Sequence, residues 1–335
     1  MRTQVAIIGA GPAGLLLSQL LHVAGIDSVV LERRSRAYVE ARVRAGVLEQ
    51  GTVDLLTSAG IGQRVRRDGL RHDGIKIAVN GELFRVDFRA LTGTSVTVYG
   101  QTEITRELIA LAIARGTPIV FEAEDVRIGG IDSDKPFVEW TVAGERQHLD
   151  CEFVAGCDGQ HGISAALIPA DHKACYERGY PFGWLGILAD CPPCDDEIIY
   201  AYHDRGMALA SQRSRARSRY YIQVPLTERL EDWPDERLWD EVALRLGALA
   251  ARGMVRAPAI EKSIAPLRSS VSQPMRHGRL FRAGDAAHIV PPTGAKGLNL
   301  AASDVHYLSE ALIAHYRDGD ASGLDGYSER ALRHV

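Results

Sequence analysis

The sequence predicts an α/β fold, α+β overall, in which a Rossmann-like dinucleotide-binding domain carries an inserted antiparallel sheet. Two observations predict the first domain: an N-terminal apolar run leads into the pattern Gly9-x-Gly11-x-x-Gly14, and a second apolar run ends at Glu32. That order corresponds to strand, tight turn, helix and strand. A third observation predicts the insertion, because short apolar and aromatic-rich segments alternate with polar turns over 182–224.

The glycine pattern has a physical reason at each position. Gly9 lets the turn close, Gly11 lets the backbone approach a pyrophosphate, and Gly14 lets helix and strand pack closely. The phosphates then lie at the positive end of the helix that starts near Ala13, where backbone N–H groups point outward. Glu32 follows Gly14 by 18 positions (32 − 14), close to the roughly 20-residue offset of an acid that binds ribose hydroxyls. A bound dinucleotide is therefore predicted.

The composition of the 335 residues is that of an ordinary globular protein, with 46% apolar and 24% charged residues and a net charge of −4. This balance offers no basic face for nucleic acid, and no apolar run reaches the roughly 18 residues of a membrane span. The N-terminus enters a strand at once, so we expect no signal peptide. Five scattered cysteines indicate a reducing cytoplasm, and Cys191-Pro-Pro-Cys194 is interpreted as a turn rather than a redox or metal site.

The spacing of apolar residues predicts the remaining helices and strands, and the chain is expected to divide into three segments. Expected helices cover 46–59, 101–114 and 236–246, and expected strands cover 136–142, 147–155, 198–202, 207–212, 220–224 and 280–285, with a hairpin turn at 143–145. We expect residues 1–180 to form the main nucleotide-binding domain and 181–265 the substrate-binding sheet. Residues 266–335 would return to the first domain and begin a C-terminal helical region, with a ligand site between the domains.

Two later motifs indicate which dinucleotide binds. Asp158 ends a strand inside the glycine turn of 155–159, and Asp285 does so again inside 282–288. Beside glycines at a strand terminus, Asp285 can accept a hydrogen bond from a ribityl hydroxyl without crowding. The run 297–302 should start a helix whose N–H groups face the flavin pyrimidine ring, where negative charge collects on reduction. Together with the N-terminal pattern, these motifs predict FAD.

With these motifs the sequence resembles the flavoprotein aromatic hydroxylases that have one FAD domain, and within them the members that act on 4-hydroxybenzoate. The resemblance runs from Arg2 to about Tyr327 and includes the specific stretches 44–51, 98–103 and 285–304. It implies that NADPH reduces FAD, that O₂ adds to the reduced flavin to give a hydroperoxide, and that the terminal oxygen passes to the ring carbon ortho to the substrate phenol. The product would be 3,4-dihydroxybenzoate.

A carboxylate inside an apolar pocket needs a cation and hydrogen-bond donors, and Ser211-Gln212-Arg213 on the inserted sheet offers them. Ser211 and Arg213 share one face of a strand at period two, and a guanidinium binds a carboxylate through two parallel hydrogen bonds. Tyr221 matches the family position that adds another donor. Because a lone arginine on a strand is more often a surface cation, this assignment depends on the match.

The phenol end needs a proton acceptor, because removing the phenol proton raises electron density at the attacked carbon. By the resemblance, Tyr200 contacts the phenol oxygen and His72 is the outer histidine of a proton relay that reaches solvent. Pro292 contributes its backbone carbonyl near the same hydroxyl. Without the match, Tyr200 would be interpreted as a core aromatic and His72 as an exposed loop residue.

The resemblance also implies contacts to both nucleotides. Positions that match FAD contacts are Arg42, Val43, Arg44, Ala45, Gly46, Val47, Gln101, Asp285, Leu298 and Asn299. Positions tied to NADPH or to the swing of the flavin ring are Arg33, Tyr38, Arg44, Arg219 and Arg268. The arginine-rich run 33–44 is by default a solvated face, but beside this fold it suits a 2′-phosphate, so NADPH is predicted over NADH. Gln160 and Ala165 depart from the aromatic residue and arginine of better-known members.

Three alternatives stay open. The chain is a related hydroxylase of another phenol or aminobenzoate, a flavin halogenase, or a non-catalytic FAD-binding protein that senses aromatic acids. The segment 182–187 faintly resembles the tryptophan-rich halogenase motif but lacks its second tryptophan. Family members continue beyond the position of Val335, where a second relay tyrosine and much of the dimer contact are expected. A homodimer is therefore the expected assembly.

Overall fold

The central sheet confirms the predicted strand–helix–strand start. The structure is a computed structural model, and it describes residues 1–42 and 46–335. Six strands lie in the order β18–β19–β12–β1–β2–β8, and every neighbouring pair is parallel except β18–β19. Their bounds are Arg276–His277 (β18), Leu280–Arg282 (β19), Phe153–Gly156 (β12), Val5–Ile8 (β1), Ser28–Leu31 (β2) and Ile119–Val120 (β8).

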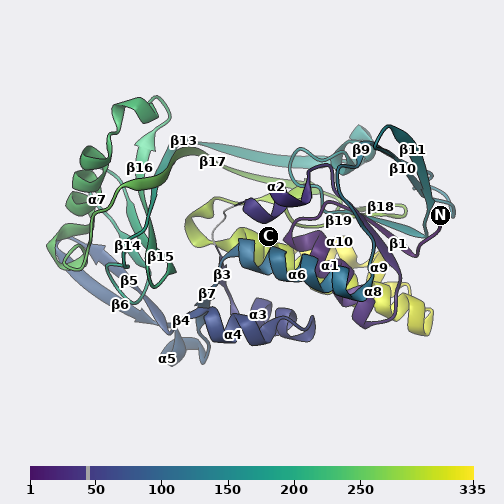
Figure 1. The fold of residues 1–335 in the computed structure, drawn as a ribbon, viewed down its shortest axis with the longest axis horizontal. Coiled ribbons are helices and arrows are strands. Elements are labelled where there is room, and N and C mark those ends of the chain that lie inside the picture. The colour runs from purple at the N-terminus through teal and green to yellow at the C-terminus, as the bar shows by residue number, and fades with distance from the viewer. Residues whose placement is uncertain (43–45) are drawn as a thin grey trace.

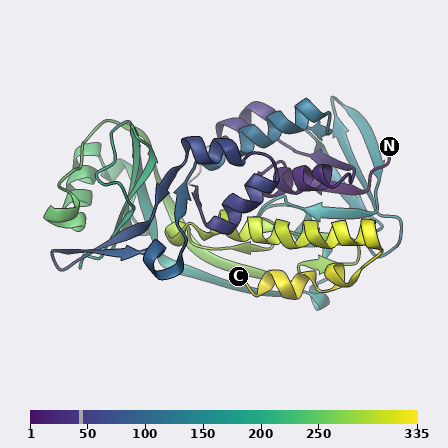
Figure 2. The same ribbon diagram turned by 90° about the horizontal axis from the view of Figure 1, so that it is seen from below.

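Three long helices pack beside this sheet. Helix α1 (Pro12–Val23) contacts β2 and also α6 (Gln101–Arg115) and α8 (Lys296–Asp318). Figure 2 shows α8 running along the molecule beside α1. Residues 14–21 of α1 are all buried, because the sheet and the two helices cover it on several sides. The helices expected at 101–114 and from residue 297 are confirmed.

The inserted sheet has eight strands in the order β20–β17–β13–β16–β15–β14–β5–β6, and all its pairs are antiparallel except β14–β5. The bounds are His288–Ile289 (β20), Ala259–Gln273 (β17), Ala174–Ala189 (β13), Arg217–Pro225 (β16), Ala208–Ser214 (β15), Ile199–Ala201 (β14), Gly74–Val79 (β5) and Glu82–Asp87 (β6). Helix α7 (Asp235–Ala250) packs on one face, where Trp239 contacts Tyr220 edge-on at 5.2 Å. The expected strands of 198–224 and the helix at 236–246 are confirmed, whereas β5 and β6 were not predicted.

Two strands of this sheet are much longer than the others. β13 and β17 pair with each other from Ala174 opposite Gln273 to Ala189 opposite Ala259. At one end β13 also pairs with β16, and near the other end β17 pairs with β20, where Val271 lies opposite His288. Figure 1 shows the two strands crossing from the α7 side of the molecule to the side of the central sheet. They therefore connect the inserted sheet directly to the segment that carries Asp285.

Two small sheets and several short helices complete the described chain. The small sheets have the orders β11–β10–β9 and β3–β7–β4. Their strands are Glu124–Gly129 (β9), Phe137–Val142 (β10), Glu145–Asp150 (β11), Val47–Leu48 (β3), Leu70–His72 (β4) and Val96–Val98 (β7). The short helices are Arg36–Ala41 (α2), Gln50–Ser58 (α3), Gly62–Asp68 (α4), Phe88–Thr92 (α5), Ser322–Asp325 (α9) and Tyr327–Leu332 (α10). No helix among the described residues is both long and apolar enough to cross a bilayer.

Three sequence predictions need correction. The helix expected over 46–59 begins only at Gln50, because 47–48 pair with β7 and a side chain at Gly46 would overlap the carbonyl of Tyr99. The strand expected over 147–155 is two strands of different sheets, β11 and β12. The strand expected over 280–285 ends at Arg282, and a short 3₁₀ turn follows in which Gly284 has φ 64°.

Candidate active site

The N-terminal glycine turn has the geometry that a dinucleotide pyrophosphate requires. Gly9 adopts φ 108°, a conformation that favours glycine. A Cβ on Gly14 would overlap the carbonyl oxygen of Gly9, so the close packing of α1 on the turn depends on glycine there. Around Gly11, in contrast, an added Cβ would meet no described protein atom within 4 Å. In the described part of the chain no side chain caps α1, so its first N–H groups are available to a phosphate.

The acid at the end of β2 lies at the same edge of the sheet. Glu32 Oε2 accepts the N–H of Ala10 at 2.9 Å, and Oε1 accepts the N–H of Arg34 at 2.8 Å. These bonds hold the carboxylate beside the glycine turn. This is the edge at which an acid reaches the ribose hydroxyls in Rossmann-like sites.

Buried polar groups hold the turn that presents Asp285. Asp285 itself is exposed, whereas the side chains of His288 and Asp304 are each only 1% exposed. Asp304 Oδ2 accepts the N–H of Gly284 at 2.8 Å and faces His288 Nε2 at 2.6 Å. Burial raises the pKa of Asp304, and the hydrogen bond from His288 opposes that rise. Helix α8 thereby fixes the backbone on both sides of Asp285.

The strand before this turn is held by a second buried group. Arg282 Nη2 donates to the carbonyls of Ser272 at 2.8 Å and Pro274 at 2.7 Å, and Nη1 donates to the carbonyl of Ala286 at 3.2 Å. Tyr327 Oη donates to the carbonyl of Arg282 at 2.8 Å. Burial lowers the pKa of Arg282, because its partners are neutral acceptors rather than carboxylates. The turn is therefore tied to β17 as well as to the C-terminal helices.

The start of α8 is tied to β3 and to the start of α3. Asn299 Oδ1 accepts the N–H of Glu49 at 2.9 Å and the hydroxyl of Thr52 at 2.8 Å, and Nδ2 donates to the carbonyl of Val47 at 2.8 Å. A small hollow between α1 and α8 is lined by both Ala13 and Leu298. Two widely separated sets of predicted FAD contacts are thus brought together.

The remaining predicted FAD contacts lie close to that region or outside the description. Gln101 is the first residue of α6, and Gly46 packs against the backbone before it, at Tyr99. Arg42 ends α2. Val43, Arg44 and Ala45 lie outside the described residues.

Three neighbouring strands place candidate substrate residues on one face of the inserted sheet. Tyr200 of β14 lies opposite Leu209 of β15, which lies opposite Tyr221 of β16. Ser211 follows Leu209 by two positions and therefore shares this face. Helix α7 packs on the other face, which carries Tyr220.

Arg213 is a partly buried cation whose described partners are neutral. Its Nη1 donates to Ser211 Oγ at 3.3 Å and to the carbonyl of Gln212 at 2.9 Å. No carboxylate in the described part of the chain forms an ion pair with it, because the neighbouring Glu261 is bound by Arg219 at 2.9 Å. Burial lowers the pKa of Arg213, and the charge of Arg219 acts in the same direction. Such a group strongly favours an incoming anion.

The face that carries Tyr200 is attached to the segment of Pro292. Tyr200 Oη donates to the carbonyl of Thr293 at 2.7 Å, and Trp184 Nε1 donates to Thr293 Oγ1 at 3.0 Å. Trp184 also contacts Tyr221 edge-on at 5.8 Å. Burial raises the pKa of Tyr200, so the phenol stays protonated near neutral pH. The face therefore lies where the inserted sheet meets the start of α8.

His72 and Gln212 form a separate buried pair. Gln212 alternates with Ser211 and Arg213 along β15, so its side chain points to the opposite side of the strand. Its Oε1 lies 3.2 Å from His72 Nε2. His72 is only 1% exposed rather than at the surface, and burial lowers its pKa. No hydrogen bond among the described residues joins His72 to Tyr200.

The predicted NADPH residues occupy the surface. Arg33 and Tyr38 are exposed, and the guanidinium of Arg34 lies 5.1 Å from the Tyr38 ring centroid. Arg268 donates to the side chain of Gln160, so two positions that the family ties to NADPH contact each other. The assignment of these residues to NADPH stays a prediction.

Three residues of this region were not assigned to a site from the sequence. Thr293 acts through its backbone carbonyl, for which a sequence carries no signal. His288 and Asp304 did carry one, because a charged residue inside the buried stripe of α8 needs a partner. Their partnership was hidden because they are 16 positions apart in the sequence.

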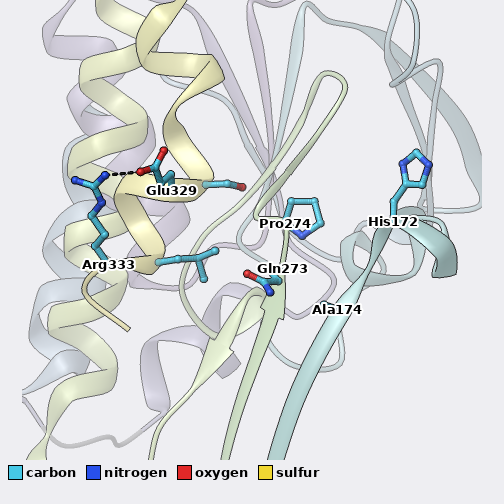
Figure 3. Close-up of a pocket in the computed structure, with 8 residues that line it drawn as sticks. His172, Ala174, Gln273, Pro274, Glu329 and Arg333 are labelled. Atoms are coloured by element: carbon cyan, nitrogen blue, oxygen red, sulfur yellow. Dashed lines mark hydrogen bonds and ion pairs between the residues drawn. The ribbon is translucent and has the colours of Figure 1, made fainter.

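A separate hollow of about 720 Å³ lies beside the C-terminal helix (Figure 3). Gln273 and Pro274 at the end of β17 form part of its wall, and Glu329 and Arg333 of the C-terminal segment form another part. None of its lining residues belongs to the predicted site. Among the described residues, no group of His, Cys, Asp and Glu side chains is arranged to hold a metal ion.

Comparisons with known proteins show the family to which the chain belongs. Residues 2–335 match the model of the FAD binding domain family. The chain is 55% identical over 336 residues to the p-hydroxybenzoate hydroxylase of Acinetobacter baylyi, which covers 100% of this chain and 83% of that protein. The structure of PqsL from Pseudomonas aeruginosa, a probable FAD-dependent monooxygenase, matches with a TM-score of 0.82 at 22% identity, over 100% of this chain and 93% of that chain. The p-nitrophenol 4-monooxygenase of Pseudomonas putida matches with a TM-score of 0.80 at 21% identity, over 99% and 88%.

The structural matches confirm the predicted fold class, and the family match confirms FAD as the cofactor. The residues described above fit that cofactor, because the glycine turn, Glu32, the Asp285 turn and the start of α8 meet at one edge of the central sheet. The chain therefore belongs to the FAD binding domain family and, within it, to the p-hydroxybenzoate hydroxylases, a group of FAD-dependent aromatic hydroxylases.

Proposed function

We propose that this chain hydroxylates 4-hydroxybenzoate at the ring carbon ortho to its phenol, with NADPH and O₂, and forms 3,4-dihydroxybenzoate. The identity of 55% to the p-hydroxybenzoate hydroxylase of A. baylyi supports the proposal. The observation that carries it is the partly buried guanidinium of Arg213, which has no acid partner among the described residues and shares its sheet face with Tyr200. The homodimer expected from the resemblance stays a prediction.

The carboxylate of the substrate binds to Arg213. A guanidinium and a carboxylate form two parallel charge-assisted hydrogen bonds, each contributing about 1.5–3 kcal/mol. Ser211 Oγ donates to the carbonyl of Arg219 at 3.0 Å, so its lone pairs accept from Arg213 and hold the guanidinium in place. Tyr221, on the adjacent strand, supplies a further donor.

The phenol of the substrate binds at the other end, beside Tyr200. Because Tyr200 donates its own proton to the carbonyl of Thr293, its oxygen is left to accept the substrate O–H. The raised pKa of Tyr200 keeps this donor bond in place near neutral pH. His72 has a lowered pKa, is neutral under the same conditions and is suited to take up the phenol proton.

The cofactor supplies, when bound, the redox chemistry that activates O₂ with electrons from NADPH. The chain holds it through the glycine turn, Glu32, the Asp285 turn and the first N–H groups of α8. The aromatic wall of Trp184, Tyr221 and Tyr200 excludes water from the substrate side, which strengthens every charged contact inside.

The experiment compares Arg213→Ala with Arg215→Ala, a matched control in the exposed turn that follows. Loss of the Arg213 guanidinium should raise the dissociation constant for 4-hydroxybenzoate about 100-fold, equivalent to about 2.7 kcal/mol, whereas the control should bind as the parent does. Substrate titration of the holoenzyme measures affinity, and chromatography measures 3,4-dihydroxybenzoate per NADPH oxidised. Equal affinity in Arg213→Ala and the parent would refute the pose. Binding without stimulated NADPH oxidation in the parent would favour the sensor alternative instead.

A further inference from the structure

We infer that Gln212 is a positioning residue that holds His72 in the tautomer with its proton on Nε2, so that the histidine takes up and returns a proton at Nδ1. The inference rests on the proposed function, in which His72 accepts the proton of the substrate phenol. It replaces direct substrate contact as the role of the Gln212 side chain, which points away from Ser211 and Arg213.

The hydrogen bonds of Gln212 fix which of its two amide atoms faces the histidine. One amide atom lies 2.7 Å from the main-chain carbonyl of Asp195, and a carbonyl accepts but never donates, so this atom is the nitrogen Nε2. The oxygen Oε1 therefore faces His72 Nε2 at 3.2 Å. Because an amide oxygen only accepts, the proton of neutral His72 must be on Nε2.

The carbonyl that orients Gln212 is itself anchored. Asp195 Oδ2 binds Lys76 Nζ of β5 at 2.6 Å, and Oδ1 accepts the N–H of Glu197 at 3.0 Å. Gln212 is only 6% exposed, so water does not compete for its amide. The tautomer of His72 is thus set by a chain of contacts that begins on another strand.

The second ring nitrogen of His72 is left without a partner. Nδ1 is buried and has no hydrogen bond among the described residues. Leaving a buried acceptor in this state is unfavourable, and a role in proton uptake accounts for keeping it. In that step the O–H bond of the substrate phenol breaks, and a bond forms between its proton and the Nδ1 lone pair of His72. The imidazole ring becomes positive while the phenol oxygen becomes negative.

The bond to Gln212 survives this change of charge. Nε2–H donates to Oε1 in both the neutral and the protonated ring, so His72 is charged and discharged without turning. Burial lowers the pKa of His72, whereas the bond to Gln212 and the nearby acids raise it. The charged groups around the ring are Asp195 with Lys76, Glu197 with Arg85, Asp196, and the pair of Arg71 and Asp73.

Nitrogen NMR tests the tautomer directly, in holoenzyme that carries ¹⁵N-labelled histidine and no substrate. We expect a protonated Nε2 and an unprotonated Nδ1 for His72 at pH 7.5, with His72→Asn used to assign the signals. Gln212→Met should introduce the other tautomer. Gln223→Met is the matched control, because Gln223 lies on β16 and binds the N–H of Met207 instead. A proton on Nδ1 in the parent, or an unchanged tautomer ratio in Gln212→Met, would overturn the inference.

The pH profile separates positioning from a merely structural role. In Gln212→Glu the carboxylate stabilises the imidazolium, so the pKa of His72 should rise by about one to two units. Because Nδ1 must be unprotonated to accept, the rising limb of the hydroxylation rate should move to higher pH by the same amount. Gln223→Glu should leave it in place. If His72→Asn alters the pH profile but Gln212→Glu leaves the rising limb in place, the inference is contradicted. If His72→Asn has no effect on the profile, the relay in the proposed function is contradicted instead. The NMR result then still decides the tautomer of His72.

Discussion

Gly11 and Gly14 belong to one motif, yet the space around them differs. A methyl group on Gly14 would overlap the backbone of Gly9, whereas one on Gly11 would meet no described protein atom within 4 Å. We therefore expect Gly14→Ala to lower the free energy of unfolding by about 1–3 kcal/mol. Gly11→Ala should change it by less than about 0.5 kcal/mol but weaken FAD binding, because the methyl group would stand where the pyrophosphate approaches.

Urea unfolding of the apoprotein and fluorescence titration with FAD measure the two effects separately. Equal losses of stability in both variants would contradict the distinction. A Gly11→Ala variant that binds FAD as tightly as the parent would show that the phosphates do not approach this position.

Residue roles that follow from the local sequence were predictable, and those that depend on contacts between distant positions of the chain were not. The positive φ of Gly9 and the tight packing of Gly14 follow from the motif itself. The contact between His72 and Gln212 joins positions 140 residues apart, and no local pattern encodes it. One signal was nevertheless present: the alternation that puts Ser211 and Arg213 on one face also puts Gln212 on the other.

Among the elements, helix α8 is unusual because a charged residue, Asp304, lies at one of its buried positions. Asp304→Ala should lower the free energy of unfolding by about 3–5 kcal/mol, because it leaves His288 and the N–H of Gly284 buried without their acceptor. Asp304→Asn should cost less, since an amide oxygen can still accept these bonds. Glu310→Ala, at an exposed position of the same helix, is the control. Thermal or urea unfolding measures all three, and a loss in Asp304→Ala no larger than in Glu310→Ala would refute the role of the pair.

The elements that sequence analysis missed lack a hydrophobic signal. The first six residues of β13 are exposed, so nothing in 174–179 alternates between apolar and polar in the way a half-buried strand does. β6 is largely exposed as well. The run 147–155 looked continuous because pairing partners decide where a strand belongs: β11 pairs with β10, whereas β12 pairs with β1 and β19. By contrast, the apolar periodicity of α6 and α7 was sufficient to predict both helices.

At the scale of the whole molecule, the sequence contains one G-x-G-x-x-G pattern, and we expect NADPH to bind without a nucleotide-binding fold of its own. The exposed Arg33 is the predicted partner of its 2′-phosphate. Arg33→Ser should therefore lower kcat/KM for NADPH about 10- to 150-fold, as expected for one lost charge-assisted hydrogen bond, and leave kcat/KM for NADH nearly unchanged. Arg36→Ser is the matched control, because Arg36 is paired with Glu40 at 2.6 Å.

Steady-state kinetics with both nucleotides provide the measurement. Comparable kcat/KM values for NADPH and NADH in the parent enzyme would contradict the predicted preference. An equal effect of the two serine variants would show that Arg33 does not cause this preference.

The paired strands β13 and β17 limit how this molecule can move. They pair with each other over 174–179 and again over 183–189 of β13, with an interruption of the register between Gly179 and Gly183, and each strand spans about 50 Å. Domains joined by single linkers swing about a hinge, but here a rigid-body opening would have to break a long hydrogen-bonded ladder at once. We therefore expect the spacing between the sheet that bears Arg213 and the turn that bears Asp285 to change little through turnover. Entry of the aromatic acid, exit of the catechol and any swing of the isoalloxazine must take place by local shifts within a stiff frame.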